Sequence, residues 1–129
     1  MVCLDTSIII DYLNGEKKII ELVDSYRLKE KISTTTITEF ELLKHKDKIK
    51  RSLAEEILDS LQVYSFNRPS ALEASKIFEK LRDLGKMINE NDILIAAIAI
   101  ANNELLITRD EKFNYINDER IFVISNNIK

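Results

Sequence analysis

Five acidic residues stand at the ends of apolar or β-branched segments, where a charged side chain usually has a specific role. They are Asp5, Glu39, Glu41, Asp92 and Asp110. Two carboxylates about 4 Å apart repel each other by roughly 4 kcal/mol at an effective dielectric constant of 20. A divalent cation offsets this repulsion, and carboxylate oxygens without His or Cys suit hard ions such as Mg²⁺ or Mn²⁺. Such a site can activate water for the hydrolysis of phosphodiester bonds.

Each acid also has a purely structural interpretation. Asp92 fits the third position of a helix capped by Asn89, and Asp110 fits the cap of a short helix. The Thr-x-x-Glu spacings at residues 36–39 and 38–41 fit the capping-box pattern. Acids near helix N-termini also gain about 0.3–1 kcal/mol from the helix dipole. Capping explains each acid singly, but it does not explain a convergence of several acids.

The segments around these acids alternate between strand and helix patterns. Short apolar or β-branched runs predict strands at residues 2–5, 32–36, 62–66, 104–108 and 121–125. Helical patterns predict helices at residues 7–13, 17–28, from 37 into 44–51, after a Ser52 cap, from Pro69 to Gly85, at 92–101 and at 110–115. Long crossovers between short strands predict a three-layer α/β/α domain with a mainly parallel central sheet of about four to five short strands.

Two of the predicted helices carry expectations about burial. The segment 92–101 is apolar on all sides, so we expect it to be the most buried helix. In the helix that ends at Gly85, the residues expected to face the core are Leu72, Ile77, Phe78, Leu81 and Leu84.

The predicted strands place the acids at one edge of the sheet. Asp5, Asp110 and the pair Glu39/Glu41 each follow the carboxyl end of a strand. Ligands bind at that edge in open α/β sheets. Asp92 joins the group if its helix starts at the same edge. The pattern therefore predicts one acidic site assembled from four separate segments.

Length and composition favour one domain over residues 1–129. The 129-residue chain has 45% hydrophobic and 32% charged residues, which suffices for a core and a solvated surface. The single cysteine, Cys3, excludes an intramolecular disulfide and suits a reducing compartment. The longest apolar run is nine residues, whereas a membrane helix needs about 20. We expect a cytoplasmic protein without membrane association.

Several function classes are disfavoured. The net charge of −3 lacks the basic footprint of non-specific nucleic-acid binding, and the two glycines cannot form a P-loop or a GxGxxG turn. Thr6-Ser7 follows Asp5 where a phosphotransfer domain of the receiver or phosphatase type has Asp-x-Asp. Arg109 is a possible RNA contact. The basic stretch KHKDKIKR (44–51) can steer RNA, although such a run is more often a solvated helix face.

Three segments, in this order and spacing, resemble the PIN domain and, more narrowly, a VapC-type toxin ribonuclease. They are LDTSIIIDYL (4–13), STTTITEFELL (33–43) and INENDILIAAIAIANNELLITRDEKF (88–113). The resemblance implies a metal-dependent endoribonuclease, the toxin of a toxin–antitoxin system, which hydrolyses RNA phosphodiester bonds with metal-activated water. It also implies a cognate VapB-like antitoxin and a homodimer.

The resemblance also assigns residues to the site. Matched by motif, the metal-binding and catalytic acids are Asp5, Glu41, Asp92 and Asp110, with Mg²⁺ or Mn²⁺ as cofactor. Ser7 and Thr108 match supporting positions. Glu39 remains an alternative to Glu41, which its spacing from Thr38 favours. A catalytically inactive PIN-like module that binds RNA or protein is the alternative function, and the retention of all the acids argues against it.

Overall fold

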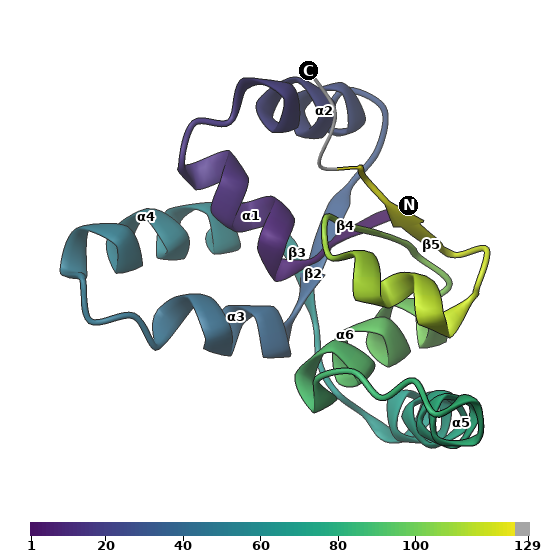
Figure 1. The fold of residues 1–129 in the computed structure, drawn as a ribbon. Coiled ribbons are helices and arrows are strands. Elements are labelled where there is room, and N and C mark those ends of the chain that lie inside the picture. The colour runs from purple at the N-terminus through teal and green to yellow at the C-terminus, as the bar shows by residue number, and fades with distance from the viewer. Residues whose placement is uncertain (126–129) are drawn as a thin grey trace.

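A five-stranded sheet forms the centre of the computed structural model, which describes residues 1–125 (Figure 1). Its strands are β1 (Val2–Leu4), β2 (Ile32–Thr35), β3 (Gln62–Tyr64), β4 (Leu105–Thr108) and β5 (Ile121–Val123). They run in the order β3-β2-β1-β4-β5, and every neighbouring pair is parallel. The predicted parallel sheet is confirmed. β1, which Asp5 directly follows, lies at the centre of the sheet.

Helices cover both faces of the sheet (Figure 1). They are α1 (Thr6–Leu13), α2 (Lys17–Arg27), α3 (Thr36–Leu43), α4 (Lys48–Asp59), α5 (Arg68–Leu84), α6 (Glu90–Ala101) and the 3-10 helix η1 (Glu111–Ile116). One core cluster joins α1 to α4 with the strand residues Val2 and Leu4, and the other joins α5, α6 and η1 with Cys3. Successive strand residues face opposite sides of the sheet. The predicted three-layer architecture is therefore confirmed.

The helix α6 has the deepest burial, as its composition predicts. Seven of its residues are buried, and its flanks pack against α5 and the sheet. Because α6 packs against α5, α3 and two strands, it forms a rigid support for the acid in its first turn. Within residues 1–125, no helix is long and apolar enough to cross a membrane.

The expected burial of α5 is wrong for three residues. Ile77 and Leu81 are buried, but Leu72, Phe78 and Leu84 are 59%, 42% and 57% exposed. The helix α5 is the outermost element on its side and packs mainly against α6. A single packing partner buries only a narrow stripe of a helix, so the apolar residues beside that stripe remain exposed.

The helix boundaries near the basic stretch also differ from the prediction. The helix α3 ends at Leu43, and α4 begins at Lys48. The cap of α4 is Asp47, whose carboxylate accepts from the backbone amides of the residues two and three positions later, so Ser52 is an interior residue. Aspartate competes with the helix for backbone donors and therefore starts a new helix here.

Candidate acidic site

The sheet order brings the predicted acids to one edge. Asp5 directly follows the central strand β1, whose neighbours are β2 and β4. The helix α3, which carries Glu41, begins where β2 ends, and Asp110 lies two residues after β4. The first turn of α6 carries Asp92, and α6 packs against both α3 and β4. Four segments that are distant in sequence therefore meet beside Asp5.

Asp5 is buried, and hydroxyl groups hold one of its two carboxylate oxygens. Its Oδ2 accepts a hydrogen bond of 2.6 Å from Thr108 Oγ1 and one of 3.0 Å from Ser7 Oγ. Backbone amides orient these hydroxyls, because Arg109 N donates to Ser7 Oγ and Asp110 N donates to Thr108 Oγ1, each at 3.0 Å. With their oxygens occupied as acceptors, both hydroxyls direct their protons to Asp5. The structure thus places the two predicted supporting residues against this acid.

The other oxygen of Asp5, Oδ1, is buried and has no hydrogen-bond partner within residues 1–125. Burial raises the pKa of Asp5 above its ordinary value, the hydrogen bonds from Thr108 and Ser7 oppose this, and the charge of Glu41 adds to it. A buried acceptor without a partner carries a desolvation cost of about 1–3 kcal/mol, or more when it is charged. Such an atom is typical of a site that binds a ligand.

Glu41 also has one oxygen held by a hydroxyl. Thr6 Oγ1 donates to Glu41 Oε1 over 2.6 Å. Glu39, by contrast, makes no hydrogen bond or ion pair within residues 1–125. The charge of Glu41 raises the pKa of both Asp5 and Asp92, whereas Glu39 does not contribute to either shift. The geometry therefore favours Glu41 over Glu39 as the glutamate of the site.

Asp92 experiences the combined charge of the other acids. Burial, together with the smaller effects of the charges of Asp5, Asp110 and Glu41, raises its pKa from 3.8 to about 7. Lys112 acts in the opposite direction. The other three carboxylates are therefore close enough to oppose the ionisation of Asp92, which is the electrostatic condition that a bound cation relieves.

The structural interpretations of the acids have mixed outcomes. Asn89 caps α6, as expected, and Asp92 is the third helical residue, but the Asn89 side chain accepts from the amide of Asn91. Among the described residues Asp92 makes no capping hydrogen bond. Asp110 does cap its short helix, because it accepts from the amide of Lys112 at 3.0 Å.

The two capping boxes predicted at residues 36–39 and 38–41 are wrong. The cap of α3 is Thr35, whose hydroxyl accepts from the amide of Thr38. Neither Glu39 nor Glu41 therefore belongs to a capping box. Glu41 is therefore held by its hydrogen bond with Thr6 and not by a capping interaction.

Arg109 is directed toward α1. Its Nη1 donates to Asp11 Oδ2 over 2.8 Å, and its side chain is only 18% exposed. Its Nε has no hydrogen-bond partner within residues 1–125. The basic stretch KHKDKIKR, in contrast, is exposed along its whole length, and it spans a turn and the start of α4. Of the two predicted RNA contacts, Arg109 is thus held by an ion pair with Asp11, and the basic stretch forms a solvated surface.

The donor set fits a hard divalent cation. It consists of carboxylates, without His or Cys. Asp5 and Glu41 each have one oxygen that makes no hydrogen bond within residues 1–125. Within those residues, no three Asp, Glu, His or Cys side chains stand close enough together to ligate one ion. Changes in side-chain rotamers would therefore have to bring the oxygens onto a shared cation. Carboxylates that repel one another are expected to stand apart without such a charge.

Comparison with known proteins agrees with this architecture. The family model of the PIN domain matches residues 2–119. The chain belongs to the PIN-domain family. This PIN domain is 35% identical over 99 residues to the ribonuclease VapC3 of Methanocaldococcus jannaschii, a match that covers 74% of this chain and 94% of that protein. The sequence resemblance to VapC-type proteins is thereby confirmed.

Solved structures of toxin–antitoxin complexes share the fold of this PIN domain. VapBC2 from Rickettsia felis, bound to a DNA fragment from its promoter, matches with a TM-score of 0.82 and 25% identity, over 96% of this chain and 98% of that chain. VapBC-1 from nontypeable Haemophilus influenzae matches with a TM-score of 0.82 and 28% identity, over 95% and 98% of the two chains.

Sequence reasoning did not identify two hydroxyl residues of the site. Thr6 contacts Glu41, and the buried Thr38 contacts Thr6. Thr6 stands directly after Asp5, so its place in the motif was a usable signal. Thr38 also carried a signal, its Thr-x-x-Glu spacing from Glu41, but that spacing gave no indication of a contact with Thr6.

Proposed function

We propose that residues 1–129 form a single metal-dependent endoribonuclease domain and act as the toxin of a toxin–antitoxin system. The observation that carries this proposal is the buried Asp5, beside three further carboxylates. Two hydroxyls hold one of its oxygens, and the other has no hydrogen-bond partner in the described part of the chain. The similarity to a VapC3 ribonuclease supports RNA as the substrate.

In this proposal Asp5, Glu41, Asp92 and Asp110 hold Mg²⁺ or Mn²⁺. The bound cation would supply a water of lowered pKa and compensate the charge that develops on the phosphodiester. Ser7 and Thr108 keep Asp5 in one orientation through their bonds to Oδ2. The buried helix α6 keeps Asp92 in register with the other acids. The residues thus supply an anionic site in which Asp5 is already oriented and the other carboxylates would adjust their rotamers around the cation.

A cleavage assay tests the proposal. The purified chain, free of antitoxin, should cut members of an RNA panel in Mn²⁺ or Mg²⁺, and EDTA should abolish the cutting. Asp5→Asn should be inactive with an unchanged circular dichroism spectrum, whereas Asp59→Asn, at the exposed end of α4, should cut like the wild type. Wild-type activity of Asp5→Asn would refute the site. Metal-independent RNA binding without any cleavage would favour the inactive binding module.

We propose further that a VapB-like antitoxin docks on an apolar groove with a basic rim. The groove has a volume of about 280 Å³ and lies between α1, α3 and α4, with lining residues Ile10, Leu13, Asn14, Leu42, His45, Lys50 and Leu53. Exposed apolar residues beside positive charges favour an amphipathic segment with acidic residues. The structural relatives are toxin–antitoxin complexes, which supports this kind of partner.

Binding to the product of an adjacent antitoxin-like gene tests this surface. Leu53→Asp should abolish the complex in isothermal titration calorimetry, whereas Leu28→Asp, on a surface outside the groove, should bind like the wild type. Equal affinities of the Leu53→Asp variant and the wild type would assign the antitoxin to another surface.

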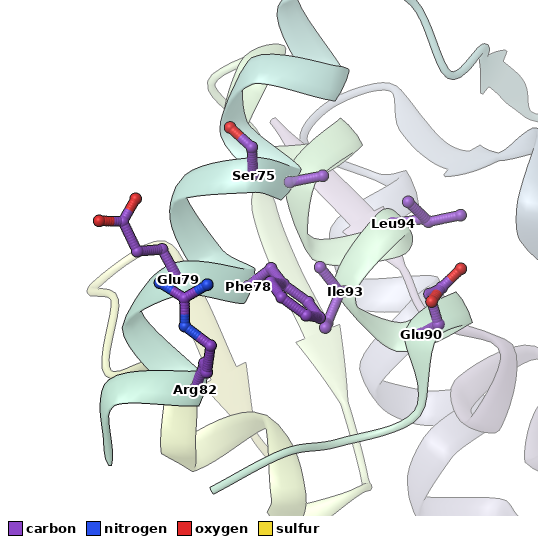
Figure 2. A pocket seen from close by; sticks show the side chains of 8 residues that line it. Ser75, Phe78, Glu79, Arg82, Glu90, Ile93 and Leu94 are labelled. Carbon is purple, nitrogen blue, oxygen red and sulfur yellow. The ribbon is translucent and has the colours of Figure 1, made fainter. Parts of the chain in front are cut away.

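We propose a homodimer that forms through the groove between α5 and α6 (Figure 2). Its volume is about 380 Å³, and it is lined by Ala74, Ser75, Phe78, Glu79, Arg82, Glu90, Ile93 and Leu94. Phe78 from α5 and Ile93 from α6 face each other across its floor, with charged residues of both signs around them (Figure 2). A surface with an apolar centre and charges of both signs on its rim can pair with a copy of itself.

Light scattering tests this interface. Phe78→Asp should convert the dimer to a monomer, and a Phe78→Asp variant that remains a dimer would refute the interface.

A further inference from the structure

The Thr6 hydroxyl lies in a chain of hydroxyl groups that ends at Glu41. Thr6 Oγ1 is 2.6 Å from Glu41 Oε1 and 3.0 Å from Thr38 Oγ1. Thr38 Oγ1 is in turn 3.4 Å from Thr35 Oγ1. Thr6 belongs to α1, whereas Glu41 and Thr38 belong to α3. The chain therefore links two helices at a carboxylate of the acidic site.

Counting protons assigns a direction to this chain. An ionised carboxylate can only accept, and each threonine hydroxyl has a single proton to donate. Thr6 Oγ1 is the donor in both of its contacts, and its single proton is directed to Glu41 Oε1 because that acceptor is charged and nearer, at 2.6 Å against 3.0 Å for Thr38 Oγ1. The Thr35 hydroxyl can then donate to Thr38, while its oxygen accepts from the Thr38 backbone amide at 3.1 Å. The Thr6 proton thus points toward Glu41, while Thr38 Oγ1 accepts from Thr35 and lies within 3.0 Å of Thr6 Oγ1.

We propose that Thr6 is the positioning residue that fixes Glu41, rather than Glu39, as the glutamate of the acidic site. This inference rests on the proposed function, because the orientation of Glu41 matters only if Glu41 binds a cation. The 2.6 Å separation is typical of a charge-assisted hydrogen bond between a hydroxyl and a carboxylate. Within residues 1–125, the hydrogen bond engages Oε1 and leaves Oε2 for a ligand.

The arrangement at Glu41 repeats the arrangement at Asp5. In both acids hydroxyl groups hold one oxygen, and the other makes no hydrogen bond with the described residues. Backbone amides orient the hydroxyls at Asp5, and at Glu41 the Thr6 hydroxyl has a second contact of 3.0 Å to Thr38 Oγ1. Both acids are therefore preorganised by the same physical means, and removal of the hydroxyl would release the carboxylate.

Helix geometry explains why Thr6 selects one glutamate. Residues two apart on an α-helix point about 200° apart, so only one of Glu39 and Glu41 can face α1. The contact with Thr6 identifies Glu41 as that residue. Thr38 is three residues before Glu41 and so lies on the same face of α3, where it can support the Thr6 hydroxyl.

Metal titration of Thr6→Val tests the proposal, since valine keeps the shape of threonine and removes the hydroxyl. Outer hydrogen-bond partners of metal ligands typically contribute 10- to 100-fold to affinity. We expect Thr6→Val to weaken Mn²⁺ binding by about that factor in calorimetry and Thr6→Ser to restore most of it. Thr36→Val is the matched control, because the Thr36 hydroxyl makes no hydrogen bond within residues 1–125. It should bind Mn²⁺ like the wild type.

A double-mutant comparison assigns the effect to Glu41. In a Glu41→Gln background, Thr6→Val should cause no further loss of Mn²⁺ affinity, whereas in a Glu39→Gln background the full loss should remain. An equal loss in both backgrounds would overturn the assignment. Should Thr6→Val fail to fold by circular dichroism, Thr6→Ala replaces it in the same comparison.

The failure of this inference is distinguishable from the failure of the proposed function. If the wild type neither binds Mn²⁺ nor cuts RNA, the proposed function is wrong. If the wild type binds Mn²⁺, Glu41→Gln weakens binding and Thr6→Val binds like the wild type, only the role of Thr6 is wrong. If Glu39→Gln rather than Glu41→Gln weakens binding, the choice of glutamate is wrong.

Discussion

Burial and three neighbouring carboxylates oppose the ionisation of Asp92. Its pKa rises from 3.8 to about 7 for these reasons. The acid therefore binds its proton more tightly in the folded chain than in the unfolded chain. As the pH rises from about 4 to about 7, the unfolded state loses this proton first, and the folded state loses stability. Above about pH 7 the destabilisation is complete and constant.

The substitution Asp92→Asn removes this destabilisation. A rise from 3.8 to about 7 corresponds to roughly 4 kcal/mol of unfavourable interaction in the charged form. Because Asp92 is half-buried, solvent screens part of the repulsion, which leaves about 2 kcal/mol. The lost interaction with the N-terminus of α6 subtracts about 0.5 kcal/mol. We expect a net gain of about 1.5 kcal/mol at pH 8.

Thermal unfolding in EDTA measures this gain. At pH 8 the variant should melt about 5 °C above the wild type. The advantage should shrink at pH 5 and vanish below about pH 4, where both states of the wild type are protonated. Glu90→Gln, which removes a carboxylate from the same helical turn, is the control and should show no such pH-dependent gain. A variant that is less stable than the wild type at pH 8, or a gain independent of pH, would refute the electrostatic reasoning.

Three further substitutions test separate parts of the structure. Thr108→Val removes the 2.6 Å hydrogen bond to Asp5 Oδ2, so calorimetry should report at least roughly tenfold weaker Mn²⁺ binding, and an unchanged affinity would contradict the role of that hydroxyl. Asp47→Ala removes the side-chain cap of α4 and should lower the free energy of unfolding in urea by about 1 kcal/mol; no change would mean that the cap does not stabilise the helix. Leu81→Ala leaves a cavity in the core and should lower the same free energy by about 2–5 kcal/mol, whereas the exposed Leu84→Ala should change it by no more than about 0.5 kcal/mol. Equal effects of the two leucine substitutions would contradict the burial of α5.

The sequence by itself determined the order of strands and helices and the candidate acids. Strands of β-branched residues and helices of apolar periodicity depend on the few residues around each position, so the pattern is readable locally. Parallel pairing follows because each strand is separated from the next by a crossover. The deep burial of α6 was also predictable, since a helix that is apolar on all sides can be stable only inside the molecule.

Local sequence patterns predicted helix boundaries and side-chain burial less well where competing signals overlap. The boundary between α3 and α4 lies within a run of charged residues, where Asp47 outcompetes Ser52 as a cap. The exposed apolar residues of α5, such as Phe78, follow from how few elements pack on that helix. Apolar spacing shows which residues could be buried, but the number of neighbours decides how many of them are.

Only the tertiary structure decided how the acids are held. The hydrogen bond from Thr6 to Glu41 spans 35 positions in the chain, and the one from Thr108 to Asp5 spans 103. The raised pKa of Asp92 likewise depends on charges from three other segments. Hydrogen bonds require donor and acceptor within about 3 Å, and salt screens the interaction of exposed charges beyond about 10 Å. Residue types therefore identify which groups are available, and the packing of the sheet and helices determines which of them meet.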